Sequence, residues 1–107
     1  MSLEGAGNGE LIRLCVEKRD DSAFGEIYRR YVNLVYSVCL RVLGDEADAQ
    51  DVVTACFVAF VKHAPRLGGK DNLGSWFYWC AYNAARNARL IRDRRVIREK
   101  EAYEDRK

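Results

Sequence analysis

Apolar residues recur at steps of three and four along most of this chain, which is the period of an amphipathic α-helix. The pattern predicts a short helix over 10–19, with Leu11, Leu14 and Cys15 on its inner side. The polar residues 20–22 then break the chain and supply an N-cap. A second, long helix runs to Leu43, and Gly44 is its expected left-handed stop. The inner side of this helix is formed by Phe24, Ile27, Tyr28, Tyr31, Val35, Val38 and Val42.

A third helix is predicted to begin after the capping residue Asp45 and to end at Pro65. Its first turns are acidic, which suits the helix dipole. The stretch that follows is apolar on nearly every side: Ala49, Val53, Cys56 and Phe60 can face a core, whereas Val52, Ala55, Val58 and Ala59 then face elsewhere. Two interpretations stay open. Either the helix carries a second apolar contact surface, with acidic residues suited to a basic partner, or the other helices bury it completely.

The stretch from Asn72 to Arg98 predicts a fourth helix with two unlike sides. One side is apolar and should pack on the rest of the chain: Phe77, Ala81, Ala84, Ala88 and Ile91, with Cys80 beside it. The other side combines aromatic, amide and basic side chains: Ser75, Trp79, Tyr82, Asn83 and Arg86. Aromatic rings stack on bases and guanidinium groups neutralise phosphates, so this side predicts a nucleic-acid surface. The alternative is an ordinary core helix with a solvated basic end.

The distribution of charge favours the nucleic-acid interpretation, although the net charge of +2 does not. Residues 1–70 contain nine Lys/Arg and ten Asp/Glu, whereas 84–98 contain six arginines and a single acid, Asp93. The positive charge is therefore local. The loop over 66–71 is basic and contains two glycines, but it lacks the Lys-Ser/Thr signature and the preceding strand of a phosphate-binding loop.

The four cysteines, Cys15, Cys39, Cys56 and Cys80, occur singly among apolar neighbours, and each is expected on a different helix. They are predicted to be small core residues. A disulfide or a thiol sensor is the alternative, because a sequence does not reveal spatial proximity. The single histidine and the absence of paired cysteines argue against a zinc site, and no cofactor is predicted. No catalytic constellation occurs, so we do not expect an enzyme. Nothing resembles a secretion signal or a transmembrane span, which predicts a cytoplasmic protein without membrane insertion.

These elements predict an all-α fold, a compact bundle of about four helices, in a chain of 107 residues. The bundle is expected over 10–98. Residues 1–9 are glycine-rich and predicted to be disordered, and 99–107 form a charged tail or the start of a linker.

Three motifs in order resemble a known family. The pattern D-x-x-A-F-x-x-[IL]-Y-R-R-Y corresponds to 20–31 with one extra residue, G-D-x-x-D-A-x-D-V-V to 44–53, and W-[LF]-Y-x-x-A-x-N-x-A-[RK] to 76–86, followed by a basic run. Together they resemble the second conserved region of bacterial sigma factors of the extracytoplasmic-function (ECF) subfamily. The resemblance covers about residues 10–98.

The resemblance implies a role for each surface. In that family the third helix and a face of the second dock on the clamp helices of the RNA polymerase β′ subunit, which here implies contacts from Asp48, Asp51 and Val58. The loop and fourth helix separate the promoter −10 element and hold a flipped non-template base. Lys70, Asp71, Asn72 and Ser75 would line the base-reading loop. Trp79, Tyr82, Asn83, Arg86 and Asn87 would lie along the DNA strand, and Arg94 and Arg95 belong to the basic run beyond them.

This chain also departs from the family pattern. Family members usually carry Gln-Glu where Thr54 and Ala55 stand here, at the polymerase surface, and a basic residue where Trp79 stands. Tyr82 replaces a small or basic residue. The family's helix-turn-helix domain for the −35 element is not found in this sequence, so we expect either a part of a longer protein or a short member. The alternative function is a sigma-like protein–protein module that binds polymerase or an anti-sigma factor without melting DNA.

Overall fold

The structure of the chain, a computed structural model, describes residues 2–67 and 72–106. Four helices account for most of these residues: α1 Asn8–Lys18, α2 Asp21–Leu43, α3 Glu46–Leu67 and α4 Leu73–Asp105. No strand occurs in the described ranges. The predicted all-α fold with four helices is therefore confirmed.

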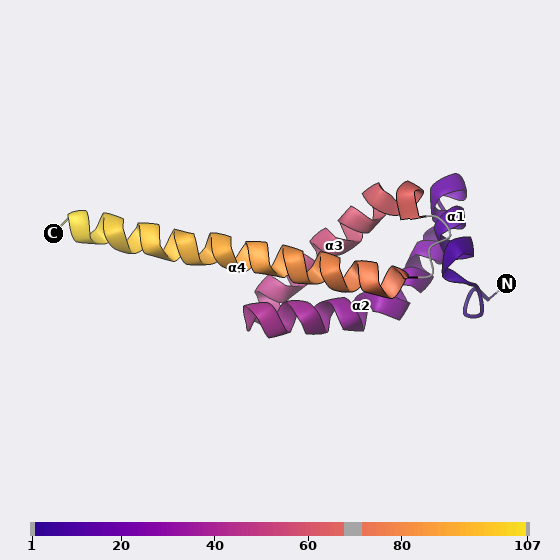
Figure 1. Ribbon diagram of the computed structural model, residues 1–107, viewed down its shortest axis with the longest axis horizontal. Helices are drawn as coiled ribbons and strands as arrows, with labels where there is room; N and C mark the ends of the chain where they lie inside the picture. The colour runs from indigo at the N-terminus through magenta and orange to yellow at the C-terminus, as the bar shows by residue number, and fades with distance from the viewer. Residues whose placement is uncertain (1, 68–71, 107) are drawn as a thin grey trace.

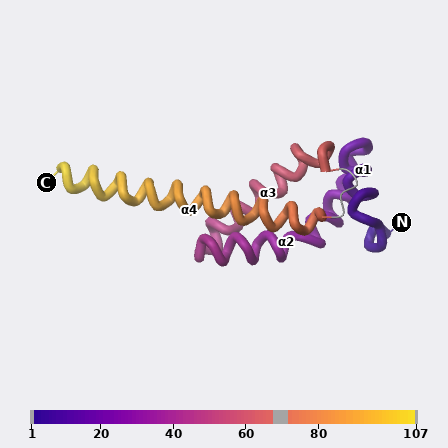
Figure 2. The backbone as a smooth tube through the Cα atoms, viewed as in Figure 1, coloured from indigo at the N-terminus to yellow at the C-terminus, as the bar shows by residue number. Residues whose placement is uncertain are grey.

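The helices form a short bundle from which half of α4 projects (Figure 1). α2 and α4 run alongside each other in the same direction, α3 returns in the opposite direction and packs against both, and α1 closes the end where α4 begins (Figure 2). The molecule is elongated, with extents of 65 × 21 × 21 Å, because α4 continues well beyond the ends of α2 and α3.

Local capping signals set most helix boundaries, as predicted. Asp20 Oδ1 accepts hydrogen bonds from the backbone N–H groups of Ser22 and Ala23, at 2.9 and 3.2 Å. Gly44 ends α2 in the left-handed conformation, with φ of 69°. Asp45 Oδ1 accepts the N–H of Asp48 at 2.9 Å and so caps α3.

The prediction that Pro65 ends α3 is wrong, because the helix continues to Leu67. Proline removes one N–H donor and crowds the preceding turn, but in the last turn few helical hydrogen bonds remain to be lost. Ala64 and Leu67 flank the proline and are buried, so packing holds this turn in place.

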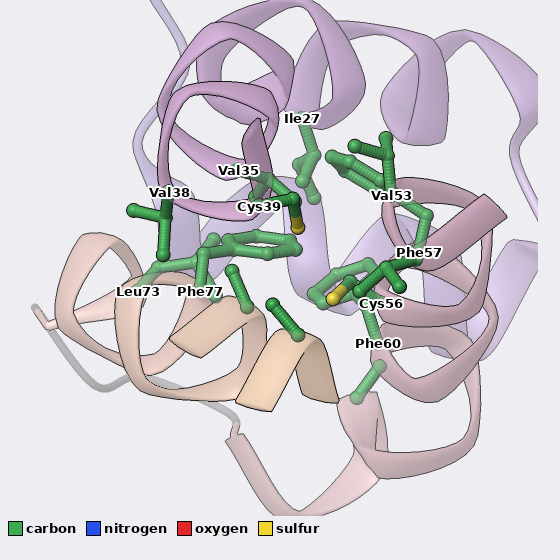
Figure 3. Packing of buried hydrophobic residues seen from close by; sticks show 14 of the residues in the cluster. Ile27, Val35, Val38, Cys39, Val53, Cys56, Phe57, Phe60, Leu73 and Phe77 are labelled. Carbon is green, nitrogen blue, oxygen red and sulfur yellow. The ribbon is translucent and has the colours of Figure 1, made fainter. Parts of the chain in front are cut away.

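An aromatic cluster forms the centre of the core (Figure 3). Phe77 of α4 is fully buried, and its ring lies 5.0 Å from Tyr31 of α2 and from Phe57 of α3, and 5.4 Å from Phe60. One side chain thus contacts both neighbouring helices. Full burial of a phenylalanine is worth roughly 1.5–3 kcal/mol, and aromatic pairs add to that.

Two side chains predicted to face inward lie at the edge of the bundle. Ile91 is 65% exposed, because α2 ends at Leu43 and little of the bundle remains to cover α4 at that level. Tyr28 is 41% exposed and covers the Phe57 ring from outside, at 4.7 Å. α4 also runs past its predicted end at Arg98 and stays helical to Asp105, with an ion pair from Arg95 to Glu99 one turn on, at 3.2 Å.

The N-terminal residues, predicted to be disordered, contact α2 through Arg30. Its guanidinium donates to the carbonyl oxygens of Leu3 and Glu4, at 3.2 and 2.9 Å, and to Asn8 Oδ1 at 3.3 Å. α1 accordingly begins at Asn8. The same arginine donates to Glu26, the one buried charged residue among those described. Although burial opposes ionisation, hydrogen bonds from Arg29 and Arg30 hold the pKa of Glu26 below its ordinary value.

Candidate functional site

The outer side of α4 carries the polar and aromatic residues that the sequence predicted there. Ser75, Trp79, Tyr82, Asn83 and Arg86 are all exposed, as are Asn72 and Asn87. Trp79 is 58% exposed, and its ring contacts Tyr78 and Tyr82 edge-on, with centroids 5.2 and 6.0 Å apart. These contacts orient the indole while much of its surface stays open to a partner.

Four of these residues line a groove between α3 and α4, of about 490 Å³, which we call the α4 groove. Its walls are formed by Ala59 and His63 from α3, by Asn72 at the N-cap of α4, and by Ser75, Trp76, Trp79, Cys80 and Asn83 from α4 itself. The rings of His63 and Trp76 lie 6.2 Å apart. An open groove with aromatic, amide and hydroxyl groups is chemically suited to a planar, hydrogen-bonding ligand such as a nucleobase.

Sequence reasoning missed the wall that α3 contributes. Ala59 and His63 are four residues apart and so lie on one side of the helix, but that spacing does not say which element faces them. Tyr82, Arg86 and Asn87 do not line the groove and lie on the helix surface around and beyond it. Lys70 and Asp71, predicted for the same site, lie outside the described residues.

The basic run beyond the groove contains two kinds of arginine. Arg86, Arg89, Arg94 and Arg98 make no ion pair with any other described residue. Arg95 pairs with Glu99, and Arg92 instead holds the bundle together. Arg92 Nη1 donates to the carbonyl oxygen of Leu43 at 3.1 Å and to Asp48 Oδ2 at 3.3 Å, joining α4 to the α2–α3 turn. The four arginines without an ion pair are free to neutralise phosphates.

The apolar third helix divides into a buried side and an exposed one. Val52 joins the core at 8% exposure, whereas Asp51, Thr54, Ala55 and Val58 are all exposed. Of the two interpretations of this helix, a second contact surface therefore agrees with the structure and complete burial does not. Asp48 lies to one side of this surface, in its ion pair with Arg92.

This second surface, the α3 outer face, extends onto α2. Val58 and Val61 are 49% and 58% exposed, and they border a shallow apolar depression with Phe24, Tyr28 and Phe57. Gln50 and Thr54 supply its polar rim, and the Thr54 hydroxyl donates to the Gln50 carbonyl oxygen at 3.2 Å. Exposed apolar side chains grouped in this way are typical of a protein-binding surface.

The geometry also bears on a metal site and on a membrane span. Among the described residues, no three or more His, Cys, Asp or Glu side chains are grouped so that they could hold a metal ion. None of the described helices contains an apolar stretch long enough to cross a bilayer.

A comparison with protein families identifies the domain to which both surfaces belong. The Sigma-70 region 2 family matches residues 27–96, about two thirds of the chain. This chain belongs to the sigma-70 region 2 family. The match begins in α2 and includes all of α3, so the α4 groove and the α3 outer face both lie within the sigma-70 region 2 domain.

Two of the relatives that this chain resembles are sigma factors, and one of them is named as an ECF sigma factor. The RNA polymerase sigma-H factor of Pseudomonas aeruginosa is 28% identical over 80 residues, which are 75% of this chain and 42% of that protein. The ECF RNA polymerase sigma factor SigW of Bacillus subtilis is 28% identical over 68 residues, 64% of this chain and 36% of that protein. The chain thus spans less than half the length of either relative. No solved structure matches it significantly.

Proposed function

We propose that this region 2 domain binds core RNA polymerase through the α3 outer face, and that it recognises and melts the promoter −10 element through the α4 groove. Transcription initiation is the process in which both activities would act, in the cytoplasm. The domain would catalyse no reaction itself. Its contribution is binding energy that favours the open promoter strands.

The observation that carries the DNA half of the proposal is the shared position of aromatic and unpaired basic groups. Trp79 and Tyr82 expose their rings beside the groove, and Arg86 follows one turn later without an acidic partner among the described residues. Flipping a base out of a duplex costs a few kcal/mol, so the open strand must be bound better than the duplex. Stacking on one aromatic ring supplies roughly 1–3 kcal/mol of that difference.

Within this proposal the groove would receive a flipped non-template base. Asn72, Ser75 and Asn83 line it with hydrogen-bonding groups, and Trp79 borders it with a stacking surface. Lys70 and Asp71 would complete the site from the neighbouring loop. Asn87 and Arg94 would follow the strand backbone along α4 as sequence-blind phosphate contacts. Arg95 would add a weaker contact, because its exposed side chain already pairs with Glu99.

Support for the polymerase half comes from the composition of the α3 outer face. Val58 offers exposed apolar area, and Asp51 is an exposed carboxylate without an ion-pair partner among the described residues. Such a surface fits a partner helix with apolar and basic side chains. We place the clamp helices of the β′ subunit there. Asp48 would contribute less, because Arg92 already neutralises it.

The test is co-purification with core polymerase, followed by DNA binding to the isolated complex. We expect the complex to bind single-stranded −10-like DNA more tightly than the same sequence as duplex. We also expect Arg86→Ala to reduce the slope of log affinity against log salt by roughly 0.7, the value for one phosphate contact on a single strand. A complex that binds both DNA forms equally would refute the melting role.

A second candidate is a module that binds polymerase or an anti-sigma factor without melting DNA. The observation that favours it is the departure from the family pattern on the exposed side of α4, where Trp79 and Tyr82 replace basic or small residues. The same measurement separates the two candidates. Stable co-purification with polymerase, together with no preference for single-stranded DNA, would support the second.

A further inference from the structure

Three of the four cysteines meet at the contact between α2, α3 and α4. The thiol of Cys56 interacts with the thiols of both Cys39 and Cys80, and all three are unbridged. Cys80 lines the α4 groove together with Ala59, which lies one turn along α3 from Cys56. Cys39 and Cys56 are buried, and both sulfur atoms lie inside the bundle, that of Cys39 beside the Phe77 ring (Figure 3). These residues are far apart in the sequence, so only the fold reveals the cluster.

Cys80 differs from the other two because it reaches the surface. Its side chain is partly exposed and lines the α4 groove beside Trp79 and Asn83. A small reagent in the groove can therefore contact this sulfur. Behind it, Cys56 offers a second sulfur that the reagent cannot reach directly.

Exposure and electrostatics together make Cys80 the nucleophile of the cluster, because the interaction with Cys56 also lowers the pKa of Cys39 but Cys39 is buried. The hydrogen bond from Cys56 lowers the pKa of Cys80 to about 7, while the same interactions raise the pKa of Cys56. Because the thiolate is the reactive form of cysteine, this lowered pKa favours reaction at Cys80. Cys15 provides a contrast, because burial and the nearby Asp20 carboxylate raise its pKa.

We propose that Cys80 is a peroxide-reactive thiol in the α4 groove, that it forms a disulfide with Cys56, and that this bond weakens strand binding. The chemical part stands on the thiol cluster alone. The regulatory part rests on the proposed DNA-binding function of the groove.

The oxidant is a hydroperoxide, and the two steps balance. The Cys80 thiolate attacks one peroxide oxygen, the O–O bond breaks, and hydroxide leaves and takes up a proton to become water, which gives a sulfenic acid. The Cys56 sulfur then attacks the Cys80 sulfur, the S–O bond breaks, and the hydroxyl group leaves with the Cys56 proton as a second water. Two thiols lose two electrons in total, and one hydrogen peroxide becomes two waters.

The disulfide changes the groove because it draws Cys80, which lines the groove, toward Cys56 behind it. An S–S bond measures about 2.05 Å, so sulfurs in nonbonded contact must approach by roughly 1.5 Å. This movement pulls Cys80 inward and shifts α4 against α3 where Ala59 and His63 face Asn83. We expect a roughly tenfold loss of single-strand affinity, comparable to losing one stacking or hydrogen-bonding partner.

The chemical test uses the full chain treated with hydrogen peroxide, followed by alkylation and peptide mass mapping. We expect one disulfide joining the Cys56 and Cys80 peptides in the parent and in the control Cys15→Ser. Cys56→Ala should instead accumulate a sulfenic acid at Cys80 that dimedone traps. A disulfide between Cys39 and Cys56 only, or none in the folded parent, would overturn the proposal. The parent itself is mapped, so this result does not depend on any variant folding.

The regulatory test compares DNA binding before and after oxidation. The protein is oxidised and freed of peroxide before core polymerase is added, so that polymerase thiols are spared. Weaker single-strand binding by the oxidised form, restored by dithiothreitol and not seen with Cys80→Ser, would support the proposal. Equal binding by both forms would overturn its regulatory part. If even the reduced complex fails to bind single strands, the proposed function fails, and the mass map still decides the thiol chemistry.

Discussion

Replacing Trp79 with alanine should weaken binding of the open strand without unfolding the domain. The indole is 58% exposed, which leaves roughly 145 Å² of its surface in water if a tryptophan offers about 250 Å². A stacked base covers one face, or roughly half of that area. At about 25 cal/mol per Å², this burial contributes roughly 1.8 kcal/mol. The predicted loss on truncation is therefore about twentyfold in affinity.

The assay is fluorescence anisotropy of a labelled single-stranded −10-like oligonucleotide, titrated with the complex of the domain and core polymerase. Stacking involves no counterion release, so the ratio of parent to Trp79→Ala affinity should be the same at low and high salt. Val96→Ala is the matched control, because Val96 is 59% exposed on the same helix but lies beyond the groove. It should bind like the parent.

Three results would contradict base stacking on Trp79. A loss below about twofold would mean that no base covers Trp79, since even the low end of stacking energies predicts roughly fivefold. A loss that disappears at high salt would assign the effect to phosphate contacts instead. An equal loss with Val96→Ala would point to general damage to α4, and circular dichroism would then show it.

Three further predictions concern docking, the core and acid stability. Asp51→Arg should abolish co-purification with core polymerase and leave the helical circular-dichroism signal intact, because the side chain is exposed; retained co-purification would remove the α3 outer face from the proposal. Phe77→Ala should lower the free energy of unfolding by about 3–5 kcal/mol in urea titrations, because it empties the centre of the aromatic cluster, and a loss below 1 kcal/mol would contradict that packing. The lowered pKa of Glu26 contributes stability above about pH 4.5 that is lost as pH falls through the folded-state value. Glu26→Gln should therefore flatten stability against pH in that acid range, and an unchanged slope would argue against it.

Features set by neighbouring residues were the ones that the sequence predicted well. Helix ends are set by caps that contact backbone groups within one turn, so the residue types of Asp20, Gly44 and Asp45 suffice to locate them. The division of α4 into an apolar and a polar side also follows from its own period. Pro65 shows the limit of this reasoning, because buried neighbours keep the final turn helical around it.

Features set by distant partners could not be predicted in the same way. Ile91 has the right spacing for the core, but whether anything covers it depends on where α2 ends. The pairing of Arg92 with Asp48 joins residues far apart in the chain and changes the role expected of Asp48. The meeting of Cys39, Cys56 and Cys80 is of the same kind. Each depends on helix packing, which a one-dimensional pattern does not contain.

The projecting half of α4 is stabilised in a different way from the bundle. From Asp93 to Asp105 every residue is exposed, and among the described residues the last hydrogen bond from α4 to the bundle is the one of 3.1 Å from Arg92 to the Leu43 carbonyl oxygen. An isolated helix of this length would be marginal, because nucleating its first turn is unfavourable. Here the packed half serves as the nucleus, and each further residue needs only propagation. The projecting half of α4 can therefore lose or gain helical turns one at a time from its free end when temperature or sequence changes. The bundle, in contrast, unfolds only as a unit.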